Sequence, residues 1–286
     1  MRRPSRNLVT KEQNDVASLP AEPLSPKNGR VKAARRLARR NSREELRLFL
    51  AEGAKALTEA LDVADCVVEV FATPQASEAY AGLRTRVESA GLPWQLASDA
   101  AVAALAGAVT PQGIVSVCRF LDMPLAKVLT GDTIVICADV RDPGNAGTII
   151  RTADAAGAGG VVLAGNSVDP YNDKTVRATV GSLFHVPLAI EDDPAAVVRA
   201  ARAAGYRVLA ADGAGETNLF DTGDELAGRV AWLFGNEAWG LPDELAALAD
   251  HRVAIPILGR AESLNLATAA AVCLYASARA AAGSAP

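Results

Sequence analysis

Residues 133–151, TIVICADVRDPGNAGTIIR, are predicted to form an apolar strand, a loop rich in proline and glycine, and the start of a helix. Five further apolar runs follow, each separated from the next by a helical stretch: residues 160–164, 186–190, 207–211, 230–234 and 252–257. Apolar strands that alternate with helices are typical of a parallel sheet covered on both faces. We therefore expect an α/β domain over residues 131–286, with its ligand at the carboxyl ends of the strands.

The sequence before this domain predicts a smaller mixed α/β domain over residues 29–118. Helices are expected over residues 44–61, 76–90 and 99–105, and strands over residues 66–71, 94–96 and 112–118. Residues 119–130, which include Pro124, suit a linker between the two domains. Residues 1–28 are polar, contain Pro20, Pro23 and Pro26 among their four prolines, and show no sustained apolar period, so we expect a loosely ordered tail there.

Positive charge is concentrated at the front of a chain whose net charge is −4. Residues 1–47 hold 13 Lys and Arg against 5 Asp and Glu, a net charge of +8, which leaves −12 for the remainder. A helix from Val31 would place six of these cations on one face: Lys32, Arg35, Arg36, Arg39, Arg40 and Arg43. Such runs are usually solvated faces, but a polyanion would relieve the repulsion among them. We interpret this face as an RNA contact.

The cysteines and the termini argue against several other classes of protein. The four cysteines form no CxxC pair and the two histidines lie apart from them, so neither a metal site nor a disulfide framework is expected. The basic start is not followed by an apolar segment, and the Ala-rich C-terminal stretch is interrupted by Arg279. We expect no signal peptide, no membrane span and a cytoplasmic location.

Three motifs stand where predicted strands end. The first runs from Asn145 to Arg151, where glycines let the backbone approach a ligand. The second, LFGNEAWGLP at residues 233–242, places Glu237 before a helix, where it either complements the helix dipole or orients a substrate. The third, IPILGRAESLNL at residues 255–266, offers Ser263 as a helix N-cap and an Asn265 that helix propensity does not favour. No GxGxxG supports a nicotinamide site.

Together and in this order, the three motifs resemble the SpoU (TrmH-type) branch of the SPOUT RNA methyltransferases, over residues 133–281. The resemblance implies S-adenosylmethionine-dependent methylation of an RNA ribose 2′-hydroxyl, and a deep trefoil knot that topology rules alone would not predict. It assigns as catalytic residues Asn145, Arg151, Glu237, Ser263 and Asn265. It assigns to the cofactor site Ala211, Asp212, Gly213, Leu233, Gly235, Asn236, Ile255, Ile257, Leu264 and Asn265.

The sequence FLAEG at residues 49–53 makes the N-terminal part resemble the L30e-like substrate domain of the same family. The expected RNA contacts are Lys32, Arg35, Arg36, Arg39, Arg40, Arg141 and Arg177. An added substrate domain favours structured 23S ribosomal RNA over tRNA, in rRNA processing or in resistance to antibiotics that target the ribosome. The resemblance further implies a homodimer.

Proton removal from the ribose hydroxyl leaves the role of Arg151 open. A guanidinium is normally a permanent cation that only donates hydrogen bonds. Either Arg151 is desolvated and acts as the base, or it binds the target phosphate and leaves the proton to that phosphate or to water. Glu237 would fix either Arg151 or the loop. Two other functions remain as alternatives, a SPOUT base methyltransferase and an RNA-binding module without turnover. Within VRATVGSLFHVP, residues 176–187, Phe184 is expected in the core and His185 in packing or hydrogen bonding.

Overall fold

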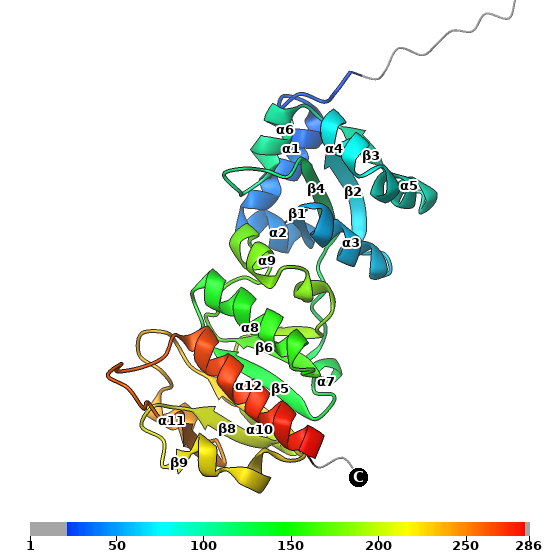
Figure 1. Cartoon of the computed structure of the whole chain (residues 1–286). Helices are drawn as coiled ribbons and strands as arrows, with labels where there is room; N and C mark the ends of the chain where they lie inside the picture. Colours follow the sequence, from blue (N-terminus) through cyan, green and yellow to red (C-terminus); the bar gives the residue numbers. More distant parts are fainter. Residues whose placement is uncertain (1–21, 284–286) are drawn as a thin grey trace, which may run out of the picture.

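The computed structural model describes residues 22–283, which form two domains stacked end to end (Figure 1). Most of the expected N-terminal tail, residues 1–21, lies outside the described residues. The last part of that tail is not loose. Leu24 pairs with Ala97 in a β-bridge, and its backbone N–H donates to the carbonyl of Leu96 at 2.8 Å. The chain therefore joins the first domain before residue 28.

The N-terminal domain is the expected mixed α/β unit. Its described strands form a four-stranded sheet in the order β1-β4-β2-β3, in which β4 is antiparallel to both its neighbours. The strands are β1 (Leu48–Glu52), β2 (Val67–Ala72), β3 (Trp94–Leu96) and β4 (Ile114–Arg119). The helices are α1 (Gly29–Arg35), η1 (Arg36–Ala38), α2 (Arg40–Leu46), α3 (Ala54–Asp62), α4 (Pro74–Ala79), α5 (Ala81–Ser89) and α6 (Asp99–Leu105).

The single basic helix expected from Val31 is wrong. Arg39 has extended backbone angles, φ −97° and ψ 132°, and separates α1 and η1 from α2. This break lets Arg43 turn inward, where it is 5% exposed and donates to the carbonyls of Leu37 and Ala38 and to Asp169 of the second domain. Arg43 is thus a structural cation of the domain junction and does not belong to an exposed basic stripe.

The helix expected over residues 44–61 is also wrong, because strand β1 lies within it. Arg47 takes a left-handed conformation with φ 55° and ends α2. Phe49 and Ala51 are fully buried between less buried neighbours, the alternation of a strand. The stretch is short, and its leucines and alanines are spaced in a way that fits both a strand and a helix. The sequence pattern alone therefore could not decide between the two. Similarly, the expected helix 76–90 is divided into α4 and α5 at Tyr80.

The C-terminal domain confirms the expected parallel sheet. Seven described strands pair in the order β7-β6-β5-β10-β8-β11-β9, and every pair is parallel. The strands are β5 (Thr133–Ala138), β6 (Gly160–Ala164), β7 (Leu188–Glu191), β8 (Arg207–Ala211), β9 (Thr217–Asn218), β10 (Val230–Phe234) and β11 (His251–Ala254). The helices are α7 (Leu125–Val128), α8 (Pro143–Ala155), α9 (Asp173–Thr179), η2 (Ser182–Phe184), α10 (Pro194–Ala203), η3 (Leu219–Asp221), η4 (Gly223–Leu226), α11 (Asp243–Ala246) and α12 (Leu266–Gly283).

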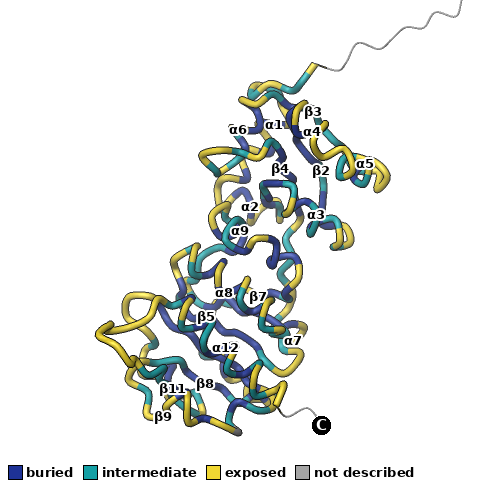
Figure 2. Tube along the Cα trace, in the orientation of Figure 1, coloured by how far each residue is buried: buried dark blue, intermediate teal, exposed yellow. Residues whose placement is uncertain are grey.

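Alternate residues of the strands pack against different helices. On β5, Val135 and Cys137 join the core that includes α8 and α12, whereas Ile134 and Ile136 join the core that includes α10. Figure 2 shows the central strands as buried tube between these layers. Burial on both faces explains why the strands read as continuous apolar runs. The trefoil knot implied by the resemblance stays a prediction.

Helix α12 is the one helix within residues 22–283 that is long and apolar enough to cross a membrane by length and composition. It packs on the sheet through Ala270, Cys273 and Leu274, which are at most 1% exposed. The buried Trp232 of β10 also donates its indole N–H to Ser277 Oγ at 2.9 Å. Through these contacts, α12 packs against one face of the sheet and shields it from solvent.

The junction between the two domains is an aromatic cluster reinforced by polar contacts. Phe49 of β1 packs against Tyr171 and against Phe184, which is buried as expected. The Tyr171 hydroxyl accepts from the backbone N–H groups of Leu121 and Asp122 and donates to Asp122 Oδ1 at 2.8 Å. The core is therefore continuous across the junction.

His185 makes a polar connection across the same junction. Its Nδ1 lies 2.8 Å from Asp154 Oδ2 on α8, and its Nε2 lies 3.1 Å from Glu59 Oε2 on α3. Both ring nitrogens can donate to carboxylates only when the imidazole is protonated. The hydrogen bond to Asp154 is the largest cause of a raised pKa of His185, and Glu59 adds to it.

We expect His185→Gln to lower the melting temperature of the protein at low pH more than at high pH. A raised folded-state pKa stabilises the fold fully below the unfolded value of about 6.5, and this contribution is lost as pH rises through the folded pKa. Thermal unfolding of both proteins between about pH 5 and pH 9 measures the difference. A difference that does not change with pH would contradict the prediction.

Candidate active site

A cavity of about 260 Å³ opens at the carboxyl ends of β8, β10 and β11, beside the start of α12. Ligands of parallel sheets bind at the carboxyl ends of the strands, and the cavity has this position. Apolar side chains and polar groups both line it, and one side is open to solvent. The lining residues are Ala211, Asp212, Gly213, Phe234, Asn236, Glu237, Gly240, Val253, Ile255, Ile257, Glu262, Ser263, Leu264, Leu266 and Ala269.

Seven of the ten residues assigned to the cofactor from sequence line this cavity: Ala211, Asp212, Gly213, Asn236, Ile255, Ile257 and Leu264. Leu233 does not, because its side chain packs in the core on the α10 side of the sheet. Gly235 contributes by having no side chain, since a Cβ there would lie 2.4 Å from the carbonyl of Gly240. Asn265 lies at the start of α12 outside the lining.

Sequence reasoning missed several cavity residues, and two signals could have found them. Phe234 lies between the assigned Leu233 and Gly235, and Val253 lies two residues before the assigned Ile255, so their places at the strand ends could have indicated them. Leu266 and Ala269 share a face of α12 at the helical spacing of three. Gly240 and Glu262 carried no signal of their own.

Glu237 fixes the loop that begins the first motif. Its Oε1 accepts from the backbone N–H of Asp142 at 2.9 Å and from Asn145 Nδ2 at 3.2 Å, and its Oε2 accepts from the backbone N–H of Arg141 at 3.1 Å. Burial alone would raise the pKa of Glu237, but these donors favour the carboxylate and hold the pKa below its usual value. Of the two roles expected for Glu237, the structure shows the contact with the loop.

The loop also has its own anchors. Asp142 caps α8 by accepting from the backbone N–H of Asn145 at 2.7 Å. Asp139 has a positive φ of 56°, and its carbonyl accepts from the buried Asn236 Nδ2 at 2.7 Å. Non-glycine residues in this conformation are uncommon and concentrate at functional sites. The first and second motifs are therefore held against each other by backbone as well as by side chains.

Asn265 connects the third motif to the first. Its Oδ1 accepts from the backbone N–H groups of Ala267 at 2.9 Å and Thr268 at 3.3 Å, which makes Asn265 the N-cap of α12. Its Nδ2 donates to Asn145 Oδ1 at 3.0 Å. The expectation that Ser263 caps this helix is wrong, because α12 begins two residues later than it would require.

We expect Asn265→Ala and Asn265→Asp to separate these two contacts. Alanine removes the cap and should destabilise the protein by about 1 kcal/mol, whereas aspartate caps equally well and should restore most of that stability. Neither variant can donate to Asn145, so both should methylate RNA more slowly than the parent. Chemical denaturation and single-turnover methylation measure the two effects. Full activity in the aspartate variant would show that the contact with Asn145 is not needed.

Two residues assigned to catalysis lie apart from this hydrogen-bonded group. Arg151 is exposed on α8 and makes no side-chain hydrogen bond or ion pair with the described residues. Ser263 is exposed and lines the cavity, likewise without a hydrogen-bond partner among residues 22–283. The structure thus brings together Asn145, Glu237 and Asn265, and leaves Arg151 and Ser263 facing solvent.

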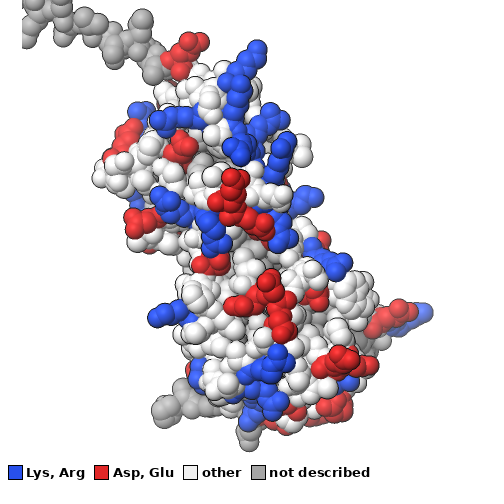
Figure 3. All heavy atoms as spheres, turned by 180° about the vertical axis from the view of Figure 1, so that it is seen from behind, with Lys and Arg blue, Asp and Glu red and all other residues white. Residues whose placement is uncertain are grey.

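The expected RNA contacts differ in how strongly they are already paired. Lys32, Arg35 and Arg39 are exposed and form no ion pair within the described part of the chain. Arg36 and Arg40 pair with Glu45 and Glu44. Figure 3 shows Lys and Arg gathered over the N-terminal domain on the face seen from behind. A basic surface therefore remains, although it is assembled from short helical pieces.

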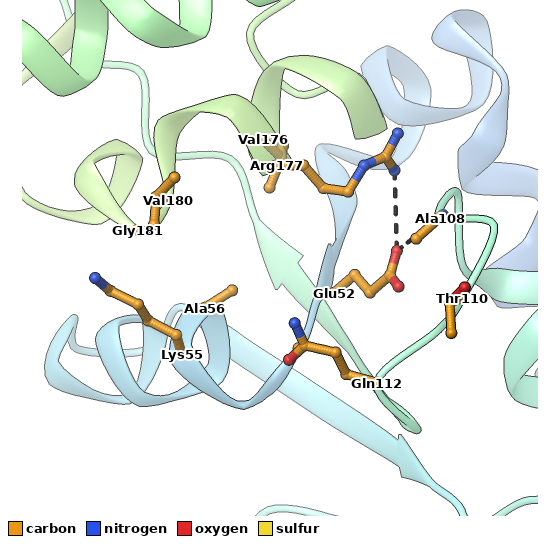
Figure 4. A pocket seen from close by; sticks show the side chains of 11 residues that line it. Glu52, Lys55, Ala56, Ala108, Thr110, Gln112, Val176, Arg177, Val180 and Gly181 are labelled. Carbon is orange, nitrogen blue, oxygen red and sulfur yellow. Dashed lines mark hydrogen bonds and ion pairs between the residues drawn. The ribbon is translucent and has the colours of Figure 1, made fainter.

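Arg177 lies beside a second cavity, of about 300 Å³, between the two domains. Figure 4 shows its side chain reaching from α9 toward Glu52, and the guanidinium is 3.9 Å from that carboxylate. It also pairs with Asp173 at 2.9 Å. These two acidic partners already offset the charge of Arg177. Within residues 22–283, no cluster of three or more His, Cys, Asp and Glu side chains is arranged to hold a metal ion.

Comparisons with known proteins match two separate parts of the chain to two family models. The model of the SpoU rRNA methylase family matches residues 132–275, and that of an MRM3-like substrate binding domain matches residues 28–116. The 23S rRNA (guanosine(2553)-2′-O)-methyltransferase RlmP of Bacillus subtilis is 34% identical over 256 residues, which cover 88% of this chain and 96% of that relative.

Two solved structures extend the comparison to the fold. An AdoMet-bound rRNA methyltransferase from Sinorhizobium meliloti aligns with a TM-score of 0.78 and 37% identity, over 88% of this chain and 95% of the other. The SpoU methyltransferase AviRb from Streptomyces viridochromogenes, in complex with AdoMet, aligns with a TM-score of 0.79 and 30% identity, over 88% and 98% of the two chains. Both cover the two domains described above.

Proposed function

The chain belongs to the SpoU rRNA methylase family, and we propose from this that it is an S-adenosylmethionine-dependent enzyme that methylates a ribose 2′-hydroxyl of 23S ribosomal RNA. The observation that carries the proposal is the contact of all three motifs at one edge of the sheet. Glu237, Asn145 and Asn265 form a chain of hydrogen bonds there, beside a cavity.

The residues around the cavity fit S-adenosylmethionine. Ile255, Leu264 and Leu266 supply an apolar surface for an adenine ring, while the exposed carboxylate of Glu262 supplies a polar group for its charged end. The cofactor supplies an activated methyl group. We propose that the loops at residues 211–213, 235–240 and 255–264 hold it at the open edge of the sheet, and that the chain is knotted there as the family implies.

The polar residues would then position the RNA. Methyl transfer requires the 2′-oxygen about 3 Å from the methyl carbon and in line with its bond, so orientation supplies much of the rate. We assign this orientation to Asn145, Ser263 and Asn265, and we assign to Glu237 the fixing of the loop. Because Arg151 is exposed, it suits binding of the target phosphate as a cation better than acting as a desolvated base.

The N-terminal domain would bind the RNA substrate through its basic surface, with Lys32, Arg35 and Arg39 available for phosphates. A homodimer is part of the proposal. The outer face of α12 supports it, because Tyr275 is 54% exposed there among alanines that permit close helix packing. We also propose a cytoplasmic location, where ribosomal RNA is found.

A methyl-transfer assay tests this function. Full-length protein is incubated with 23S ribosomal RNA and S-adenosylmethionine labelled with tritium in its methyl group, and the 2′-O-methyl sites are then mapped. Label that remains on the ribose after hydrolysis of the RNA is the expected result. Label on a base would identify a base methyltransferase, and RNA binding without label would identify a module that binds RNA without turnover.

A further inference from the structure

Trp239 is an exposed aromatic residue two positions after Glu237. Asn236 and Gly240 exchange backbone hydrogen bonds of 2.9 Å in both directions, and Ala238 N–H donates to Asn236 Oδ1. These bonds close a tight turn on the buried Asn236 and hold the intervening residues outward. The turn leaves Trp239 53% exposed. The indole is therefore presented to solvent by a well-anchored backbone.

Arg141 covers part of this indole. Its Cζ lies 4.9 Å from the centroid of the Trp239 ring, and its backbone N–H donates to Glu237 Oε2. No carboxylate pairs with the Arg141 guanidinium within residues 22–283. A cation over an exposed ring stabilises that ring less than full burial of a large aromatic side chain would. The pair thus leaves an uncovered ring surface and an uncompensated positive charge next to the cavity.

Arg141 also faces a hollow at the domain junction. This hollow of about 310 Å³ is lined by Arg40 and Arg43 of the N-terminal domain and by Arg141, Asn166 and Asn172 of the C-terminal domain. Arg43 is paired with Asp169, which also lines the hollow, and Arg40 is paired with Glu44, but the guanidinium of Arg141 has no acidic partner among residues 22–283. Arg141 therefore belongs to the loop that Glu237 fixes and, at the same time, lines this hollow beside the basic segment of the first domain. A polyanion that crosses the junction toward the cavity would pass over it.

We propose that Trp239 and Arg141 form a stacking platform for an unpaired nucleobase next to the nucleotide whose ribose is methylated. The proposal rests on the proposed function and names the part of the RNA that this rim recognises. Unpaired bases in RNA stack on aromatic rings and on guanidinium planes, and the phosphates beside them are neutralised by Arg and Lys. The exposed ring, the free guanidinium and the polar hollow supply these three contacts side by side.

The test compares Trp239→Ala and Trp239→Phe with Phe220→Ala, a control that removes another exposed aromatic ring, 60% exposed, away from the cavity lining. The substrate is a fragment of 23S ribosomal RNA around the mapped site, with 2-aminopurine placed on either side of the target. We expect the alanine variant to raise KM for RNA on the order of 10- to 100-fold with a smaller change in kcat. The phenylalanine variant and the control should stay near the parent.

Fluorescence makes the platform testable without turnover. Stacking should quench the 2-aminopurine on one side of the target when the parent protein binds, and Trp239→Ala should not quench it. An unchanged KM and an unchanged quench in that variant would overturn the proposal. So would a loss of S-adenosylmethionine affinity without RNA, or a change in oligomeric state by sedimentation, because the ring would then serve the cofactor loop or a protein interface. If the parent binds 23S ribosomal RNA but transfers no methyl group to it, and Trp239→Ala weakens that binding while Phe220→Ala does not, the proposed function fails while the stacking of RNA on Trp239 stands.

Discussion

Replacing Arg151 with lysine should slow single-turnover methylation of RNA by about 100-fold or more. Arg151 lies on α8, six residues after Asn145, and its guanidinium is exposed and unpaired within residues 22–283. A planar guanidinium can hold two phosphate oxygens at once, and the point charge of lysine cannot reproduce this fork. Both roles considered for Arg151, a base and a phosphate ligand, require the guanidinium.

The exposure of Arg151 makes this experiment easy to interpret. No contact of the side chain within the described structure is lost, so the melting temperature and the affinity for S-adenosylmethionine should stay at the parent values. Arg199→Lys is a suitable control, because Arg199 is an exposed arginine on α10, on the other face of the sheet. If Arg151 binds a phosphate, Arg151→Ala should also change the salt dependence of RNA binding. The slope of the logarithm of the binding constant against the logarithm of the salt concentration should become shallower by about 1. A near-normal rate in Arg151→Lys would remove both roles.

The sheet domain was predictable because each of its strands is recognisable from its own residues, without information from distant parts of the chain. Strands buried on both faces must be apolar throughout, so β5, β6, β8 and β10 appear as uninterrupted runs with the bounds that the structure gives them. The placement of the three motifs near one another followed from the same parallel arrangement. Only their residue-level contacts depended on the strand order, which brings Asn265 to Asn145 across 120 residues.

The N-terminal segment was harder because its burial is decided by distant residues. The charge of Arg43 predicts exposure, but Asp169 lies 126 residues away in sequence and holds Arg43 in the junction. No local pattern carries that information. The error at Leu233 is of a different kind, since a strand has only two faces and the Leu233 side chain lies on the face that packs against α10, away from the cavity. The exposure of Trp239 could likewise not be predicted from sequence, because it depends on the turn that Asn236 and Gly240 close.

Glu237→Gln should weaken both the fold and the activity, because the carboxylate accepts three N–H donors and glutamine cannot. Glutamine has one acceptor oxygen, and its amide NH₂ would meet either the N–H of Arg141 or the N–H of Asp142. Each hydrogen bond to a charged group contributes about 1.5–3 kcal/mol, so the loss of one in the transition state slows methylation roughly 10- to 100-fold. Chemical denaturation and single-turnover kinetics measure the two effects.

Acid should reproduce part of this defect in the parent protein. The pKa of Glu237 is held below its usual value of 4.5, so its contribution to stability is present above that value and is lost as pH falls through the lower folded-state pKa. Glu237→Gln should not show this part of the acid transition. Glu244→Gln, an exposed carboxylate on the nearby α11, is the matched control and should behave as the parent. If Glu237→Gln keeps the stability and rate of that control, the carboxylate does not hold the loop, and the hydrogen bonds to Arg141, Asp142 and Asn145 have no part in positioning the RNA.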